Sequence, residues 1–282
     1  MGGPLWRFGE RAFDCSERTL VMGIVNVTPD SFSDGGMFAS VDDAVRHAAR
    51  LADEAADIVD VGGESTRPGS EPVPADEERA RVVPVIERLT ASRPNLVISV
   101  DTRKAEVAAA ALDAGASIVN DVSGAADPAM FEVVRERDAG IVLMHMRGDP
   151  KTMQESPHYD DVVAEVHEFL RERIEAAEFD GIDPERIAID PGIGFGKALG
   201  HNLELLHRID ELLDLGRPVL IGPSRKRFIG TLLDLPEAER VEGTAGAVAW
   251  AIARGVHAVR VHDAKEIVRV VRVVDAIARA GP

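Results

Sequence analysis

The sequence predicts an α/β fold, a single (β/α)8 TIM barrel with an N-terminal β-hairpin closing the bottom of the barrel. Three observations support this prediction. Eight apolar, β-rich runs occur along the 282 residues, each ends in a polar cluster, and consecutive runs leave room for at least one helix. Eight strand–helix units in a chain of this length match a barrel whose polar strand ends meet at one mouth.

The first 19 residues are expected to differ from the rest. Residues 1–19 alternate short apolar and polar pieces, which predicts a β-hairpin with Trp6, Phe8 and Phe13 facing inward. In a barrel this hairpin would plug the end opposite the functional mouth, which is a structural role. Residues 20–282 are predicted to form the barrel itself, and both parts belong to one domain.

The strands are predicted from apolar runs that do not alternate with polar residues. Such runs are typical of strands buried on both faces, as in a parallel sheet. The first run, at residues 20–25, is interrupted only by Gly23 and leads into a polar loop that begins at Asn26. The other predicted strands span residues 58–61, 96–100, 117–119, 141–144, 187–189, 219–221 and 256–261.

The helices are predicted from periodicity and from end signals. Ser40 is expected to cap the first helix, whose apolar positions follow a helical period. An Ala-rich helix runs from Arg103 and is stopped by Gly115, and Asp127-Pro128 is typical of the start of the next helix. The other helices are expected at residues 76–91, 159–179, 202–215, 240–254 and 264–280, with one more starting near residue 228.

The composition indicates one globular domain without a general affinity for nucleic acid. The hydrophobic fraction is an ordinary 45%, and 32 basic against 49 acidic residues give a net charge of −17. Cys15 is the single cysteine, which excludes a disulfide framework and a cysteine-based metal site within the chain. No signal-peptide pattern and no apolar run long enough to span a membrane is found. A cytoplasmic location is therefore expected.

Three polar residues stand at predicted strand ends, where Asp and Asn are poor strand formers. They are Asp101, Asn120 and Asp190. A buried carboxylate needs partners, and together these side chains could read a flat heterocycle that carries adjacent donors and acceptors. For any one of them, the alternative is that the side chain only caps the helix that follows. The residues themselves leave both readings open.

Two further groups could bind an anion. Residues 224–227 (SRKR) contain the chain's one run of three adjacent basic residues, and the helix after it would add positive potential at its N-terminus. Arg260 and His262 end the last predicted strand beside Asn26 of the first, and could hold a phosphate or pyrophosphate. The plain alternatives are a solvated basic turn and a structural histidine.

Two glycine-rich loops are notable. Residues 192–197 (GIGFGK) have the wrong spacing for a Walker A loop or a dinucleotide-binding turn, but allow close approach of backbone to a ligand, with Phe195 as a packing wall. The loop at residues 62–74 is long and rich in Gly and Pro, as is typical of active-site lids.

Seven motifs, in order along residues 20 to 275, resemble the motif set of the dihydropteroate synthase family of pterin-binding TIM barrels. Each motif alone is modest, but the set as a whole is specific. The motifs are NVTPDSFSDGG (26–36), GGESTRPG (62–69), SVDTR (99–103), NDVSG (120–124), DPGIGFGK (190–197), SRK (224–226) and RVHD (260–263).

The resemblance implies a transferase of folate biosynthesis. It would condense 6-hydroxymethyl-7,8-dihydropterin pyrophosphate with p-aminobenzoate to give 7,8-dihydropteroate and pyrophosphate. The resemblance also implies a Mg²⁺ requirement, a homodimer and sensitivity to sulfonamides. The expected partners are these small-molecule substrates, with no nucleic acid and no membrane.

Carried over motif by motif, the resemblance also implies site residues. The pterin would be bound by Asp101, Asn120, Asp190, Lys226, Met144, Phe195 and Arg260. The p-aminobenzoate would be bound by Ser65, Thr66, Arg67, Pro68, Phe195, Lys226 and Arg227. The pyrophosphate would be held by Asn26, Arg67, Arg260 and His262, with the metal at Asn26. The implied catalytic residues are Asp101, Lys226, Arg260 and His262.

The resemblance further implies a dissociative reaction, in which the C–O bond breaks before the amine attacks. Asp101 would stabilise the developing pterin cation, and cations would neutralise the leaving group. One position departs from the pattern, because Arg227 stands where some family members carry a small hydroxyl residue that meets the aminobenzoate carboxylate. Arg227 could replace that contact or point away from the site.

Two alternatives to this function are retained. A pterin-binding barrel that transfers a methyl group would share the acidic and amide residues but should lack the SRK and NVTPDSF motifs, and both are present. A non-catalytic paralogue that keeps pterin binding would be indicated by loss of Thr66, Arg67 or Lys226, and none of these is lost.

Overall fold

The computed structural model describes residues 4–27, 36–66, 69–149 and 151–280, with the backbone alone for residues 36–40. Within them, a parallel sheet of eight strands runs in the order β8-β7-β6-β5-β4-β3-β10-β9. A parallel bridge between Ile189 and Val219 joins the two ends of this order, and Ile189 N donates to Pro218 O at 2.9 Å. The predicted (β/α)8 barrel is confirmed.

The strands are short and almost completely buried, as expected for a sheet covered on both faces. Their polar ends are brought level by the register, since Asn26 pairs with Gly62, Gly62 with Asp101, and Asp101 with Asn120. The strands are β3 (Leu20–Asn26), β4 (Ile58–Gly62), β5 (Val97–Asp101), β6 (Ile118–Asp121), β7 (Gly140–Met144), β8 (Ile187–Asp190), β9 (Leu220–Ile221) and β10 (Ala258–Val261).

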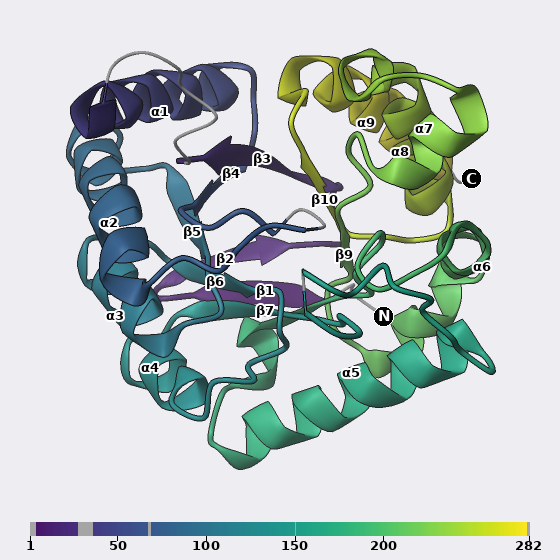
Figure 1. Cartoon of the computed structure of the whole chain (residues 1–282), viewed down its shortest axis with the longest axis horizontal. Helices are drawn as coiled ribbons and strands as arrows, with labels where there is room; N and C mark the ends of the chain where they lie inside the picture. Colours follow the sequence, from purple (N-terminus) through teal and green to yellow (C-terminus); the bar gives the residue numbers. More distant parts are fainter. Residues whose placement is uncertain (1–3, 28–35, 67–68, 150, 281–282) are drawn as a thin grey trace.

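Helices surround the sheet on its outer side (Figure 1). The main core lies between the two layers, where Val, Ile, Leu and Ala side chains of the strands meet the apolar faces of the helices. The helices are α1 (Gly36–Asp53), α2 (Ala75–Ser92), α3 (Ala105–Asp113), α4 (Met130–Glu136), α5 (Val162–Phe179), α6 (Leu199–His207), α7 (Arg227–Leu233), α8 (Val241–Ala253) and α9 (Ala264–Ala278).

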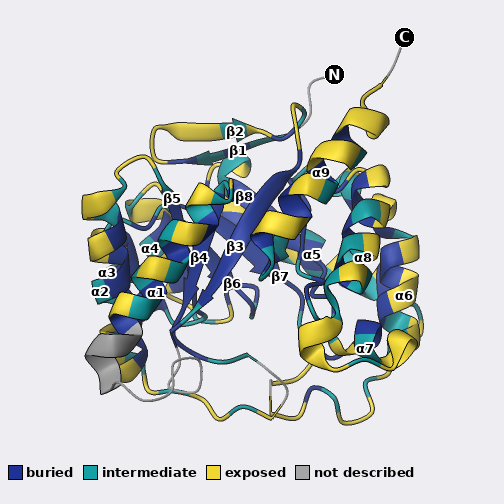
Figure 2. Ribbon diagram, turned by 90° about the horizontal axis from the view of Figure 1, so that it is seen from above, coloured by how far each residue is buried: buried dark blue, intermediate teal, exposed yellow. Residues whose placement is uncertain are grey.

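The predicted N-terminal hairpin is present as β1 (Leu5–Phe8) and β2 (Arg11–Asp14), which pair antiparallel. It lies across one end of the barrel, opposite the end that carries α7 (Figure 2). Trp6 and Phe8 are buried and belong to a second core with residues at the beginnings of the strands, such as Leu20 and Ile118. Phe13 is half-buried and packs on Phe8 with ring centroids 5.3 Å apart.

Several helix boundaries differ from the expectation. Helix α1 begins at Gly36, so Ser40 is not its cap. Helix α4 begins at Met130, because the Asp127 carboxylate instead accepts hydrogen bonds from Ala129 N and from Ala105 N at the start of α3. The segment predicted as one helix at residues 202–215 is α6 followed by a 3-10 helix, Ile209–Leu215. Local patterns indicate that a helix exists but not where tertiary contacts end it.

Candidate active site

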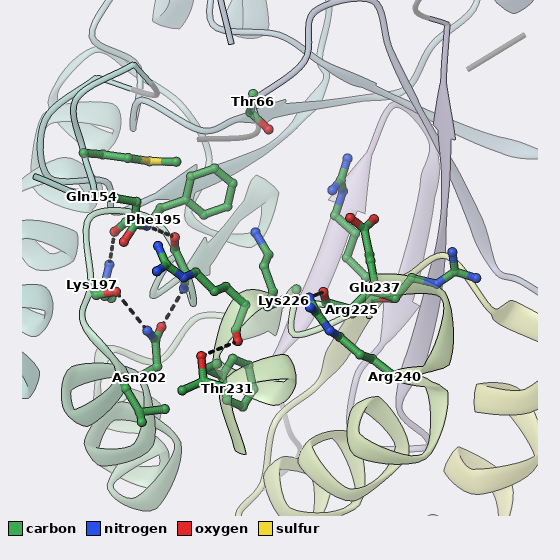
Figure 3. A pocket seen from close by; sticks show the side chains of 18 of the residues that line it. Thr66, Gln154, Phe195, Lys197, Asn202, Arg225, Lys226, Thr231, Glu237 and Arg240 are labelled. Atoms are coloured by element: carbon green, nitrogen blue, oxygen red, sulfur yellow. Dashed lines mark hydrogen bonds between the residues drawn. The ribbon is translucent and has the colours of Figure 1, made fainter. Parts of the chain in front are cut away.

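A cavity of about 920 Å³ opens at the carboxyl ends of the strands. It is walled by the ends of β3, β5 and β10, by the loops after β4, β8, β9 and β10 and, in part, by the loop between β7 and α5. Figure 3 shows side chains that line it. The sequence-predicted residues on its wall are Asn26, Ser65, Thr66, Asp101, Phe195, Lys226, Arg227, Arg260 and His262. The structure therefore gathers most of the predicted site at one mouth.

The other predicted residues are placed differently. Asn120, Asp190 and Met144 are buried, with 3%, 5% and 3% of their surface exposed, and do not line the cavity. They lie at the ends of neighbouring strands, β6, β8 and β7. Arg67 and Pro68 lie outside the described residues.

A buried charge cluster forms the inner side of the site. Arg260 Nε donates to Asp60 Oδ2 and Arg260 Nη2 donates to Asp101 Oδ2, each at 2.6 Å. Asn120 Nδ2 also donates to Asp60 Oδ2, at 3.0 Å. Arg260 Nη1 has no protein acceptor among the described residues. The cluster therefore leaves one edge of the guanidinium for an anion.

The carboxylates of this cluster are not fully satisfied. Within the described residues, Asp60 Oδ1 and Asp101 Oδ1 are buried and have no hydrogen-bond partner. Burial raises the pKa of the Asp101 carboxyl and the charge of Asp60 adds to the rise, while Arg260 opposes it. Buried acceptors without donors are unfavourable on their own, and are the groups that a ligand N–H could satisfy.

The sequence interpretation missed Asp60. It lies in the middle of β4, is fully buried, and joins Arg260 to Asn120. A signal was available, because a single carboxylate interrupts the otherwise apolar run at residues 58–61. Nothing in the sequence indicates its partners, since Arg260 lies 200 positions away.

Asp190 is held by the backbone of the glycine-rich loop. Its Oδ1 accepts a hydrogen bond from Gly192 N at 2.7 Å. Burial raises the pKa of Asp190 to about 6, against the lowering effect of Gly192 N and the nearby cations Lys226, Lys197 and Arg260. Gly192 has a φ of +70°, and a Cβ there would lie 1.9 Å from His145 O. Only glycine fits this turn.

Phe195 and Lys226 form one wall of the cavity (Figure 3). Lys226 Nζ lies 3.8 Å from the centroid of the Phe195 ring, which is cation–π geometry. Beneath them Lys197 is buried, and its Nζ contacts His145 Nδ1 at 2.9 Å and donates to Phe195 O at 3.0 Å. Burial lowers the pKa of Lys197 to about 7. The role of Phe195 as a packing wall for a ligand ring stays a prediction.

The loop after β4 is anchored rather than free along its described part. Glu64 Oε2 accepts from Lys104 Nζ at 2.5 Å and from Val73 N at 2.9 Å, and its Oε1 is 3.1 Å from Arg103 Nη2. Lys104 Nζ also donates to the buried Glu78. This ion-pair network ties the loop that carries Ser65 and Thr66 to the loop after β5.

The turns after β9 and β10 are also joined. Ser224 Oγ lies 3.0 Å from His262 Nδ1, and Arg225 Nε donates to Asp263 Oδ2 at 2.9 Å. Burial and the positive charges of Arg260 and Arg225 lower the pKa of His262 to about 3, which leaves its ring neutral at pH 7. Neither Ser224 nor Asp263 was assigned a role from the sequence.

A metal would find few ligands here. Among the described residues, no group of three or more His, Cys, Asp or Glu side chains could hold a metal ion. Asn26 lines the cavity, and its side chain has no hydrogen-bond partner within the same residues. An amide oxygen beside an anion site fits Mg²⁺, which usually keeps several waters and is held by few protein groups plus substrate phosphates.

No described helix is both long enough and apolar enough to cross a membrane.

The sequence profile of the family described as pterin binding enzyme matches residues 22–262. The dihydropteroate synthase of Synechocystis sp. is 46% identical over 273 residues, which cover 96% of this chain and 94% of that protein.

Solved structures are similar over nearly the whole chain. The Xanthomonas albilineans dihydropteroate synthase with 4-aminobenzoic acid matches with a TM-score of 0.92 and 49% identity, covering 99% of this chain and 100% of that one. The same enzyme in complex with 7,8-dihydropteroate matches with a TM-score of 0.89 and 48% identity, at the same coverage. The similarity therefore extends to structures of one enzyme solved with 4-aminobenzoic acid and with 7,8-dihydropteroate.

Proposed function

The chain belongs to the dihydropteroate synthase family of pterin-binding enzymes, and we propose that it condenses 6-hydroxymethyl-7,8-dihydropterin pyrophosphate with p-aminobenzoate. The products are 7,8-dihydropteroate and pyrophosphate. One observation of this structure carries the proposal: a single cavity brings Asn26, Asp101, Lys226, Arg260 and His262 to one mouth. That mouth offers carboxylates for a ring rich in N–H groups and cations for a leaving anion.

The pterin ring is assigned to the deep side of the site. Asp190 and Asp101 offer carboxylate oxygens, and Asn120 is held in place by Asp60. Asp101 Oδ1 has no donor among the described residues, so a ring N–H would satisfy it. Met144 and Phe195 belong to one buried apolar cluster and provide flat packing surface beside these polar groups.

The p-aminobenzoate is assigned to the outer side. Phe195 and Lys226 supply a packing wall and a cation, while Ser65, Thr66 and Arg227 line the same cavity. Arg67 and Pro68 are retained in this site from the family motif. Sulfonamides carry the same para-substituted aniline, so we expect them to compete with p-aminobenzoate.

The pyrophosphate is assigned to Asn26, Arg67, Arg260 and His262. The Arg260 edge that faces neither Asp60 nor Asp101 can donate to the leaving phosphate oxygens. Mg²⁺ at Asn26, when bound, would add positive charge that stabilises the leaving group.

In the proposed reaction the bond between the pterin methylene carbon and the pyrophosphate oxygen breaks first, and its electron pair leaves with the pyrophosphate. Arg260 and Lys226 stabilise the developing negative charge, and Asp101 stabilises the pterin cation. The amine of p-aminobenzoate then forms the new C–N bond and loses one proton. The rigid binding of both rings at one mouth supplies the proximity that this step needs.

The test is an assay of purified protein with the dihydropterin pyrophosphate, measuring pyrophosphate release and dihydropteroate formation with and without p-aminobenzoate. We expect both products in equal amounts, and only when p-aminobenzoate is present. Tight pterin binding without turnover would instead favour the non-catalytic paralogue. Methyl transfer from a methylated folate, with no condensation, would favour the methyltransferase barrel.

The proposed Mg²⁺ requirement has a separate test. Titration of inorganic pyrophosphate should show weaker binding when Mg²⁺ is removed with a chelator. In an Asn26→Ala variant the difference between the two conditions should shrink, because the amide oxygen that helps to hold the ion is gone. Equal affinity for pyrophosphate with and without Mg²⁺ would contradict the proposal.

We further propose that two copies of the chain associate through α6, α7 and α8. A hollow of about 380 Å³ lies between these helices, and Leu203, Leu232, Leu233 and Trp250 on its rim remain 39% to 55% exposed. In a chain with a net charge of −17, contact through uncharged surface avoids repulsion between copies.

The association is tested by sedimentation. We expect a mass twice the 30.3 kDa of the chain, and a return to the single mass for Leu232→Glu. Phe179→Glu is the matched control, because Phe179 is 94% exposed at the end of α5 outside the hollow. A monomeric wild type would contradict the proposal. We also propose that the protein is cytoplasmic, as the sequence predicts, and cell fractionation would test this.

A further inference from the structure

The turn after β9 contacts the turn after β10 through two side-chain pairs. Ser224 Oγ lies 3.0 Å from His262 Nδ1, and accepts a hydrogen bond from His262 N at 3.1 Å. Next to it, Arg225 Nε and Nη2 both donate to the carboxylate of Asp263. Ser224 is 4% exposed, and both Ser224 and His262 line the cavity.

The hydrogens of this contact can be assigned from what each group is able to donate. The backbone N–H of His262 can only donate, so Ser224 Oγ is its acceptor. The buried Ser224 hydroxyl hydrogen then needs an acceptor of its own, and within the described residues His262 Nδ1 is the acceptor in range. If Nδ1 carried the proton instead, the buried O–H would have no acceptor there.

We propose that Ser224 is a positioning residue that fixes His262 in the tautomer with its proton on Nε2. Nδ1 is then occupied by the Ser224 hydroxyl, and Nε2–H is the ring's donor group. The imidazole thereby offers a neutral N–H donor to the anion in the cavity. The inference rests on the proposed function, because the anion is the pyrophosphate that this reaction releases.

The tautomer matters because the ring is neutral. Burial and the charges of Arg260 and Arg225 lower the pKa of His262 to about 3, and Asp263 only partly opposes them. A neutral imidazole has one N–H and one lone pair. Facing an anion, the Nε2–H tautomer attracts it, whereas the Nδ1–H tautomer presents a lone pair and repels it.

The backbone around Ser224 is held in place by neighbouring groups. Arg225 has a left-handed φ of +56°, its N donates to Thr244 Oγ1 at 3.1 Å, and its O accepts from Arg240 Nη1 at 3.0 Å. Thr244 is fully buried in α8. These contacts and the Arg225–Asp263 pair fix the distance between the two turns, so the hydroxyl stays within reach of Nδ1.

The direct test is nuclear magnetic resonance of protein labelled with ¹⁵N histidine, with the His262 signals assigned by their loss in His262→Gln. We expect the wild-type His262 to carry its proton on Nε2 alone, in the free protein at pH 7. In Ser224→Ala the signals should shift toward a mixture of tautomers, and Ser224→Thr should keep the wild-type pattern. A wild-type His262 protonated on Nδ1, or on both nitrogens, would overturn the inference.

A second measurement tests the effect of the His262 tautomer on anion binding. Binding of inorganic pyrophosphate, measured by calorimetry, should weaken about tenfold in Ser224→Ala and remain close to wild type in Ser224→Thr. Ser16→Ala is the matched control, because that hydroxyl bonds Asp14 near the hairpin, far from the mouth. Equal affinities in wild type and Ser224→Ala would contradict the role toward the anion.

The two proposals can fail separately. If wild-type protein makes no dihydropteroate, the proposed function fails, whatever the tautomer of His262. If wild-type protein makes dihydropteroate but His262 is not in the Nε2–H form, only the inference about Ser224 fails.

Discussion

The two ends of the barrel are built on the same eight strands and are filled in opposite ways. At the bottom, Trp6 and Phe8 of the hairpin pack onto the apolar beginnings of the strands. At the mouth, the interior of the barrel is filled instead by the ion-paired side chains of Asp60, Asp101 and Arg260. The first end gains free energy from apolar burial, whereas the second must compensate the desolvation of charges. Of the two ends, the bottom is therefore the one that adds to the stability of the fold, beside the main core between strands and helices.

Both ends of the barrel contain buried polar atoms without a partner among the described residues. Trp6 Nε1 is a buried donor without a partner in the described part of the chain, so the bottom also contains one unfavourable group. The mouth carries more of them within the same part of the chain, including Asp60 Oδ1 and Asp101 Oδ1. Unsatisfied acceptors gathered beside a cavity are what a preorganised binding site leaves for its ligand.

The largest effect is expected for Arg260→Met, which removes the cation between two buried carboxylates. We expect the free energy of unfolding to fall by about 3–5 kcal/mol and dihydropteroate formation to be lost. Urea denaturation at pH 7 measures the free energy of unfolding. Adding Asp101→Asn to the Arg260→Met chain should restore part of the lost stability. Arg88→Met is the control, because the Arg88–Asp42 pair is half exposed and should contribute less than about 1 kcal/mol.

Trp6→Ala tests the opposite end. Loss of this fully buried side chain should lower the free energy of unfolding by about 3–5 kcal/mol. Turnover by the folded protein, assayed well below its unfolding temperature, should stay close to wild type because the mouth is untouched. A large fall in kcat without unfolding would show that the two ends of the barrel are coupled. The distinction between a structural bottom and a functional mouth would then not hold.

Asp190→Ala separates binding from stability at the mouth. The carboxylate is expected to accept hydrogen bonds from the pterin ring, so its loss should weaken pterin binding by about 2–4 kcal/mol. Calorimetry with a pterin on the folded variant measures this. Unchanged pterin affinity would remove Asp190 from the pterin site.

Asp190→Asn gives a pH dependence of known sign. The pKa of Asp190 is raised to about 6 in the folded protein from 3.8, so its carboxyl favours folding when protonated and this contribution is lost as pH rises through 6. The stability of the asparagine variant relative to wild type should therefore increase between pH 4 and pH 7, by on the order of 1–3 kcal/mol. A difference that does not change over this range would mean that burial does not perturb this carboxyl.

The smallest effect is expected for Arg227→Ser. Arg227 is exposed on the cavity wall, and a screened contact with the aminobenzoate carboxylate should change binding by less than about 1 kcal/mol. We expect a several-fold rise in the KM for p-aminobenzoate and a smaller change in the KM for the pterin pyrophosphate. Equal small changes in both would show that Arg227 does not take part in the site.

The fold class, and most of the residues that line the cavity, could be predicted from the sequence alone. Apolar runs without alternation predict buried parallel strands, and the polar residues that end them predict where the mouth lies. Asp101 was identified because Asp is a poor strand former, and Arg260 because it ends the last predicted strand together with His262, beside Asn26. The hairpin was predicted from a different pattern, the short alternating apolar and polar pieces that contain Trp6 and Phe8.

Which of these groups contact one another depends on the closed barrel. Asp60 binds Arg260 across 200 positions, and Ser224 reaches His262 across 38, because barrel closure and register bring distant strand ends level. Helix ends were decided in the same way, as when Asp127 bonds Ala105 N rather than starting α4. Local propensity acts over a few residues, whereas a hydrogen bond or an ion pair depends on the position of both partners. The protonation states of the mouth therefore follow from the closed barrel and not from the residue types alone.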